Sequence, residues 1–172
     1  MKPWFLVGAL APLIGDDLQF SASQVGVAIA AYYLVSGVLS PLGGRAVDWI
    51  GVRRALQLSC LLVTGGLLVI ATADEALHIA IALGVLGIPN SVVQPAANAV
   101  LAEVRSPRLQ AAVFGTVQAS IPTATLIAGL VLGIASYAGG WRWTVLSCAG
   151  LTLVALWLTR GLPASTRRVR PA

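Results

Sequence analysis

The feature of this sequence that most constrains its fold is a series of long apolar runs joined by short polar connections. The runs at about residues 24–42, 55–73, 76–102, 109–138 and 143–159 contain no Asp, Glu, Lys or Arg. A helix of about 20 apolar residues crosses the hydrocarbon core of a bilayer, and only helices and closed barrels satisfy their backbone polar groups inside lipid. Since the runs lack the alternation of barrel strands, the sequence predicts an all-α membrane protein.

Composition agrees with this class and excludes others. Hydrophobic residues make up 58% of the chain and charged residues 10%, whereas a soluble domain carries about 25% charged residues. The net charge of +5 comes from basic residues between the apolar runs, where topology signals lie, and not from a stripe on one folded face. We therefore expect the lipid bilayer as a partner and no nucleic acid.

The first apolar run, residues 3–15, is too short to cross a bilayer. One interpretation is a cleavable signal peptide, formed by Lys2, the apolar run and the small-residue site Ala9-Leu10-Ala11. The other is a first transmembrane helix whose beginning lies outside this sequence. We favour the second, because five further runs follow, and expect six crossings with a truncated first helix.

The basic residues separate by side of the membrane. If the N-terminus is cytoplasmic, the opposite side holds Arg142 as its only basic residue, together with Asp16, Asp17, Asp74 and Glu75. The positive-inside rule then places both termini in the cytoplasm of a multi-pass protein in the cytoplasmic (inner) membrane. The basic residues on the cytoplasmic side are Lys2, Arg45, Arg53, Arg54, Arg105, Arg108, Arg160, Arg167, Arg168 and Arg170.

A spaced motif lies between the second and third runs. Gly44 is followed four residues later by Asp48, then three residues later by Gly51, and then by Arg53 and Arg54. Gly44 allows a helix end to approach a neighbour closely, and Gly51 permits a turn with positive φ. Asp48, at a helix end, can meet a positive helix N-terminus or an arginine.

This motif resembles the loop signature of the major facilitator superfamily. The sequence departs from the signature at Trp49 and Val52, where the family has basic residues. In the family these groups form a relay with an acidic residue at the cytoplasmic end of the fourth helix, a place that Glu103 matches. The resemblance therefore implies a gating network of Asp48, Arg53 and Glu103 that locks one transport state.

Further segments extend the resemblance over about residues 5–160. Gly140-Trp141-Arg142-Trp143 is similar to the start of the family's sixth helix, and residues 94–98, 107–108, 115–118 and Pro122 resemble the cyanate-permease-like branch. The resemblance implies that residues 1–160 form one six-helix half of a transporter, built from two three-helix repeats of inverted topology. Such transporters bind solute between two halves near the midplane.

That architecture implies a partner beyond this sequence. The chain is then a fragment, which we favour, or a half that pairs with a second six-helix half or with a copy of itself. Residues 161–172 form a basic cytoplasmic tail or the start of the linker between halves.

Three amide side chains recur along the fourth run. Asn90, Gln94 and Asn98 are spaced at i, i+4 and i+8, which places them on one helix face. Polar groups inside lipid usually face the bundle interior or a wet cavity. One interpretation is that this stripe, with Gln118 and Tyr32, contacts the substrate. The other is interhelical hydrogen bonding, worth roughly 0.6 kcal/mol for each bond.

The remaining residues limit the classes of function that the sequence supports. The sequence shows no nucleophile–base constellation, phosphate loop or metal-ligand cluster, so we expect no enzyme, catalytic residue, cofactor or metal. No charged residue lies near the middle of an apolar run, so the sequence shows no buried carboxylate for proton coupling. The expected function is secondary active transport of a small neutral or anionic solute by alternating access. The alternative is a non-transporting membrane scaffold or assembly subunit.

Overall fold

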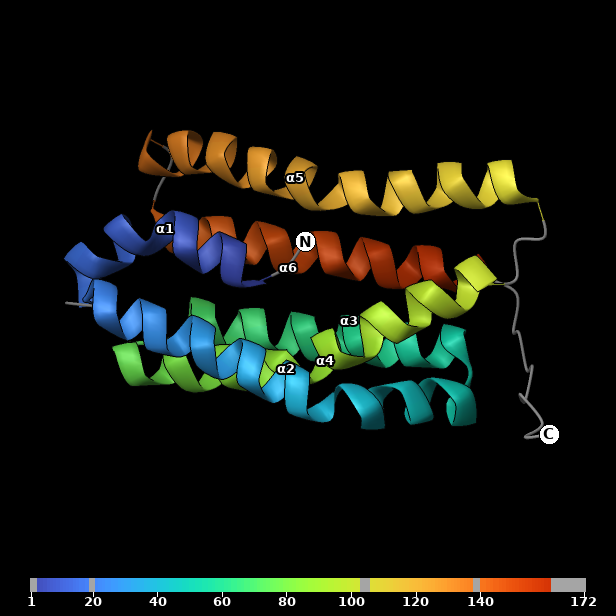
Figure 1. The fold of residues 1–172 in the computed structure, drawn as a ribbon. Coiled ribbons are helices and arrows are strands. Elements are labelled where there is room, and N and C mark those ends of the chain that lie inside the picture. The colour runs from blue at the N-terminus through green and yellow to red at the C-terminus, as the bar shows by residue number, and fades with distance from the viewer. Residues whose placement is uncertain (1–2, 19–20, 103–105, 138–139, 162–172) are drawn as a thin grey trace.

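The computed structural model describes residues 3–18, 21–102, 106–137 and 140–161. Within these residues, four helices (α2, α3, α4 and α6) are long and apolar enough to cross a membrane. The all-α prediction is confirmed, and the six-crossing topology stays a prediction. The helices are α1 (Pro3–Leu18), α2 (Ala22–Ile50), α3 (Val52–Ala71), α4 (Ala76–Ala102), α5 (Pro107–Tyr137), α6 (Trp141–Leu158) and the short 3-10 helix η1 (Thr159–Gly161), shown in Figure 1.

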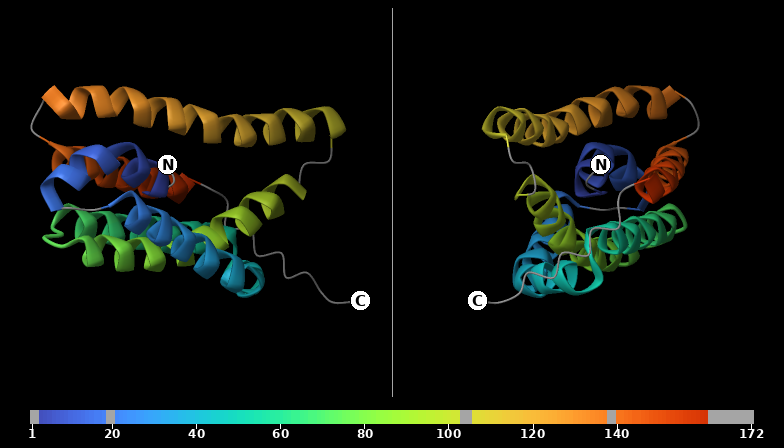
Figure 2. Two further views of the ribbon diagram at one scale, coloured as in Figure 1. Left: turned by 60° about the vertical axis from the view of Figure 1, so that its left-hand side comes forward. Right: turned by 90° about the vertical axis from the view of Figure 1, so that its right-hand side faces the viewer.

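The helices form three layers. Helices α2, α3 and α4 make one layer, α1 and α6 lie in the middle, and α5 lies on the far side of α1 and α6 (Figure 2). Helix α2 packs chiefly on α4, and α3 packs on both α4 and α6. At one end of the bundle, on the left in Figure 1, α1 and α3 end and α2, α4 and α6 begin. We call this the Arg142 end, and the opposite end the Asp48 end.

Helix α1 covers only part of the bundle. Its 16 residues span about 24 Å at ~1.5 Å per residue, and it lies over the half nearer the Arg142 end (Figure 1). Leu6, Leu10 and Ile14 are spaced four residues apart and are fully buried in the main core. The short first run therefore packs as a helix of the bundle.

Glycines allow α2 and α4 to pack closely. A Cβ atom added to Gly87 would lie 2.5 Å from the carbonyl oxygen of Tyr32, and one added to Gly43 would lie 2.8 Å from the carbonyl carbon of Ser91. A Cβ at Gly44 would meet nothing within 4 Å. Within the described part of the chain Gly44 therefore makes no close approach, and its approach to a neighbouring helix stays a prediction. One residue turns a helix by about 100°, and the packing turns Gly43 toward α4.

The motif that was expected in a connection lies mostly within helix α2. The helix continues past the predicted limit at residue 42 to Ile50, so Gly44 and Asp48 occupy its last turns. Gly51 has φ of +83°, ends α2, and directly precedes α3. The predicted positive φ at Gly51 is confirmed. Glycine suits this position because any other side chain would strain that conformation.

Candidate functional site

The gating motif lies at the Asp48 end. Asp48, Arg45 and Arg54 are exposed, and Arg53 is half-buried in the first turn of α3. Within the described part of the chain, Asp48 forms no ion pair with any of these arginines. Glu103 lies outside the described residues. The network of Asp48, Arg53 and Glu103 therefore stays a prediction.

The first amide of the α4 stripe binds a neighbouring helix. Asn90 is half-buried, and its Nδ2 donates a hydrogen bond of 2.6 Å to the Oγ of Ser36, which is buried on α2. An interhelical hydrogen bond of this kind satisfies two polar groups that lipid would leave unpaired. At Asn90 the structure therefore shows the second of the two interpretations, a helix-to-helix contact.

The other two amides of the stripe are open. Gln94 and Asn98 lie one and two turns further along α4 toward the Asp48 end, and both are exposed. Their side chains form no hydrogen bond with another residue in the described ranges. These two amides are free to bind a ligand, whereas one N–H of Asn90 is already used between helices.

Two features of the fold leave Gln94 and Asn98 open. Helix α1 covers the half of the bundle nearer the Arg142 end, and α4 turns away from its own initial direction in its second half (Figures 1 and 2). Pro89 and Pro95 lie inside α4. A proline inside a helix removes a backbone hydrogen bond and kinks the axis. The open surface therefore follows from where α1 lies and from the prolines of α4.

The structure does not bring the remaining pathway candidates to this surface. Tyr32 is 1% exposed and packs in the main core, edge to face with Tyr33 at a ring-centroid distance of 5.3 Å. Gln118 is exposed on α5, which packs mainly on α1 and α6. Of the five candidates, only Gln94 and Asn98 share one open surface.

A polar cluster at the Arg142 end was not predicted. The Arg142 guanidinium lies 3.2 Å from the Asp17 carboxylate and 3.8 Å from that of Asp74, and it donates a 3.0 Å hydrogen bond to the carbonyl oxygen of Ala73. The indole N–H of Trp141 donates to the same Asp17 oxygen at 3.0 Å. We call these five residues the Arg142 cluster. It joins the end of α1, the connection between α3 and α4, and the start of α6.

The sequence held a signal for this cluster. Arg142 is the only basic residue among the acidic residues of the sparsely charged connections, but that pattern was used for topology alone. The side chains of Arg142 and Asp17 are 41% and 52% exposed, so their ion pair stabilises the fold by only about 0–1 kcal/mol. Trp141 is 3% exposed. The buried indole therefore contributes more to this contact than the charges do.

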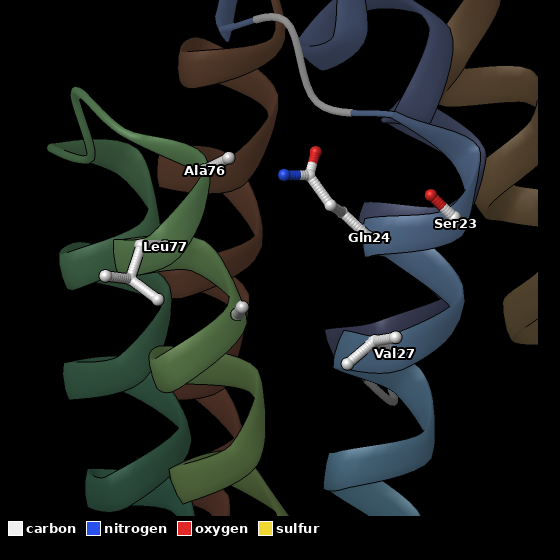
Figure 3. Close-up of a pocket in the computed structure, with 6 residues that line it drawn as sticks. Ser23, Gln24, Val27, Ala76 and Leu77 are labelled. Atoms are coloured by element: carbon white, nitrogen blue, oxygen red, sulfur yellow. The ribbon is translucent and has the colours of Figure 1, made fainter.

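A small cleft lies between the starts of α2 and α4, also at the Arg142 end (Figure 3). Its volume is about 290 Å³, and Ser23, Gln24, Val27, Ala76, Leu77 and Ala80 line it. The Gln24 Oε1 accepts a 2.8 Å hydrogen bond from the backbone N–H of Ser21, which closes the capping box of α2. The main polar group of the cleft is therefore already used in helix capping.

Comparison with known proteins relates the whole arrangement to one family. The sequence profile of the Major Facilitator Superfamily matches residues 3–172. The chain is 30% identical over 161 residues to an uncharacterized MFS-type transporter, EfpA, of Mycobacterium tuberculosis, covering 92% of this chain and 30% of that protein. It is 31% identical over 161 residues to a putative uncharacterized transporter, YgaY, of Escherichia coli, covering 90% of this chain and 39% of that protein.

A third relative has a more specific name. The chain is 24% identical over 166 residues to the hexuronate transporter of Bacillus subtilis, covering 94% of this chain and 39% of that protein. The chain thus spans 30% to 39% of the length of these three relatives. The narrower resemblance to the cyanate-permease-like branch stays a prediction.

Proposed function

Because the chain belongs to the major facilitator superfamily, we propose that it forms one half of a secondary active transporter for a small solute. The observation that carries this proposal is the pair of exposed amides on α4, Gln94 and Asn98. Exposed polar side chains on a membrane helix are costly unless they face a wet cavity or a polar partner. Transport then proceeds by alternating access, with the solute meeting these amides.

The exposed surface of α2 supports a partner half. Gly26, Ala30, Gly37 and Gly44 fall on one face of α2, and no described residue of another helix lies within 4 Å of a Cβ placed on any of these three glycines. Small residues on a membrane helix allow another helix to approach closely. The partner proposed for this surface is a second six-helix half or, failing that, a second copy of this chain.

The charge distribution supports an orientation and a gate. The Asp48 end carries the exposed residues Arg45, Arg54 and Arg160, so the positive-inside rule favours this end as the cytoplasmic one. Asp48, Arg53 and Glu103 are proposed to form the gate there. The partner half closes against it, as the family resemblance implies.

The solute is proposed to be small and neutral or anionic, because an amide N–H can donate to a hydroxyl or a carboxylate without a fixed charge nearby. Two relatives supply probes. One is the hexuronate transporter, and the other is Multidrug resistance protein 1 of Bacillus subtilis, which is 28% identical over 124 residues. A labelled hexuronate is therefore the probe for the proposed solute, and a cationic dye tests whether the surface accepts cations instead.

The test measures uptake of the hexuronate and efflux of the dye in cells that produce the chain together with its partner half, with and without Gln94→Leu or Asn98→Leu in the chain. We expect each replacement to raise the KM for the transported probe several-fold, because a hydrogen bond to the solute is lost. Val85→Leu, an exposed apolar position on the same helix, is the matched control. An unchanged KM in both amide variants would overturn the proposed solute contact.

A further inference from the structure

Helices α3 and α6 lie side by side and present one broad apolar surface, which we call the α3–α6 face. Large apolar side chains cover it, and each is roughly half exposed or more. They are Leu58, Leu61, Leu62, Leu68 and Val69 on α3, and Leu151, Leu153, Val154, Trp157 and Leu158 on α6. In a membrane protein such a surface meets lipid tails or another helix.

The register of the two helices brings specific residues together at the Asp48 end. The hydroxyls of Thr64 on α3 and Thr152 on α6 are 2.6 Å apart. The helices run antiparallel, so Arg160, eight residues after Thr152, lies level with Leu56, eight residues before Thr64. Direct contact between η1 and α3 agrees with this register. Arg160 therefore lies beside the first turns of α3, where Arg54 is exposed.

This corner of the α3–α6 face is positively charged. Arg54 and Arg160 are exposed, and neither forms an ion pair with a carboxylate in the described part of the chain. The N-terminus of α3 has no side-chain cap, so its partial positive charge adds to that of the arginines. Trp157, three residues before Arg160, is 65% exposed. Tryptophan is enriched at the boundary between lipid tails and headgroups.

The other end of the same face differs in charge. Trp143 is equally exposed and lies 14 residues before Trp157 on α6, about 21 Å away at ~1.5 Å per residue. There the nearest guanidinium, that of Arg142, is already paired with Asp17 and Asp74. The two indoles thus lie at opposite ends of the apolar surface, and among the described arginines the unpaired ones are at the Asp48 end.

We propose that the α3–α6 face binds an anionic phospholipid of the leaflet at the Asp48 end. The headgroup phosphate is held between Arg54 and Arg160, Trp157 lies at the level of the glycerol, and the acyl chains run along the leucines of α3 and α6. Charge complementarity selects the lipid, because each basic residue near the membrane surface attracts an anionic headgroup. This attraction does not depend on the type of acyl chain. This site is separate from the solute surface on α4.

The experiment titrates the purified chain, in a neutral detergent, with phosphatidylglycerol that carries brominated acyl chains, and measures quenching of tryptophan fluorescence. Brominated phosphatidylcholine is the uncharged comparison. We expect the wild-type chain to bind phosphatidylglycerol more tightly than phosphatidylcholine. In the double variant Arg54→Gln/Arg160→Gln, the ratio of the two affinities should fall by about fivefold for each arginine removed. The variant Arg54→Lys/Arg160→Lys should keep most of the preference, which separates charge from folding.

Matched controls locate the site. Arg108→Gln removes the same charge from an exposed position on α5 and should leave the preference unchanged. Trp157→Phe should reduce quenching by phosphatidylglycerol more than Trp143→Phe does. The proposal is overturned if the double glutamine variant keeps the wild-type preference, if Arg108→Gln lowers it equally, or if inorganic phosphate displaces the lipid at the same concentration. Circular dichroism confirms that each variant keeps its helix content.

Discussion

The Arg142 end and the Asp48 end of the bundle hold their helices in different ways. At the Arg142 end, the Arg142 cluster joins α1, α6 and the connection between α3 and α4 through an ion pair, hydrogen bonds and a buried indole. At the Asp48 end, the described arginines are unpaired and the amides of α4 are open. The comparison teaches that polar groups fasten one end of this bundle, while the other end leaves its described polar groups available to partners.

The largest expected effect concerns the buried indole of the Arg142 end. Trp141→Ala should lower the free energy of unfolding by about 3 kcal/mol, because it empties a buried site and removes the N–H that Asp17 accepts. Unfolding in mixed micelles measures this. Trp143→Ala is the matched control, since Trp143 is exposed on the same helix. Equal losses in both variants would show that the cluster does not fasten this end.

The next effect tests how α2 is held near the Asp48 end. Gly43→Ala should lower the free energy of unfolding by about 1–3 kcal/mol, because its new Cβ would press on the backbone of Ser91. The neighbouring Gly44→Ala should be neutral or slightly stabilising, since that Cβ meets open space and alanine favours the helix. The same unfolding assay compares the two. A reversed order would mean that the phase of α2 against α4 is wrong.

A smaller effect is expected from the ion pair itself. Arg142→Gln should lower the free energy of unfolding by no more than about 1 kcal/mol, because both partners are half exposed. The effect should shrink as salt is raised, since salt screens exposed charges. Arg45→Gln, an unpaired position at the Asp48 end, serves as the comparison. A loss of several kcal/mol at Arg142 that salt does not change would contradict this account.

The smallest effect concerns the hydrogen bond between Asn90 and Ser36. A double-mutant cycle with Asn90→Ala and Ser36→Ala should give a coupling energy of about 0.6 kcal/mol, as is usual for interhelical bonds in membranes. The same assay on Asn98→Ala and Ser36→Ala should give no coupling. Coupling of Ser36 to Asn98 but not to Asn90 would contradict the assignment of Asn90 as the helix contact and Asn98 as the open amide.

Local patterns predicted some of these features and not others. The helical class follows from the apolar runs, and the positive φ at Gly51 follows from its place in the motif. The choice of Gly43 over Gly44 depends on how α2 is turned against α4, which no local pattern records. Arg142 and Asp17 are 125 residues apart in the chain, so their contact depends on tertiary packing. The sequence therefore indicated the two charges but did not predict that they form an ion pair.

The amide stripe shows the same limit within a single helix. Spacing placed Asn90, Gln94 and Asn98 on one face, and the sequence left open whether they bind the solute or a helix. The structure separates them, because Ser36 of α2 meets Asn90 and no described residue bonds to the other two. The kink of α4 follows locally from Pro89 and Pro95, whereas the position of α1, which also causes this difference, depends on neighbours that are distant in sequence.

The measurement that tests the central claim most directly is the accessibility of Gln94 and Asn98 to water. With Cys60 and Cys148 replaced by alanine, Gln94→Cys and Asn98→Cys are exposed to a charged, membrane-impermeant maleimide from the side of the Asp48 end. A thiol reacts as its thiolate, which forms in water and not among lipid tails. The account predicts that both react at least tenfold faster, roughly, than Leu61→Cys on the α3–α6 face. Reaction at both amide positions as slow as at Leu61→Cys would contradict it.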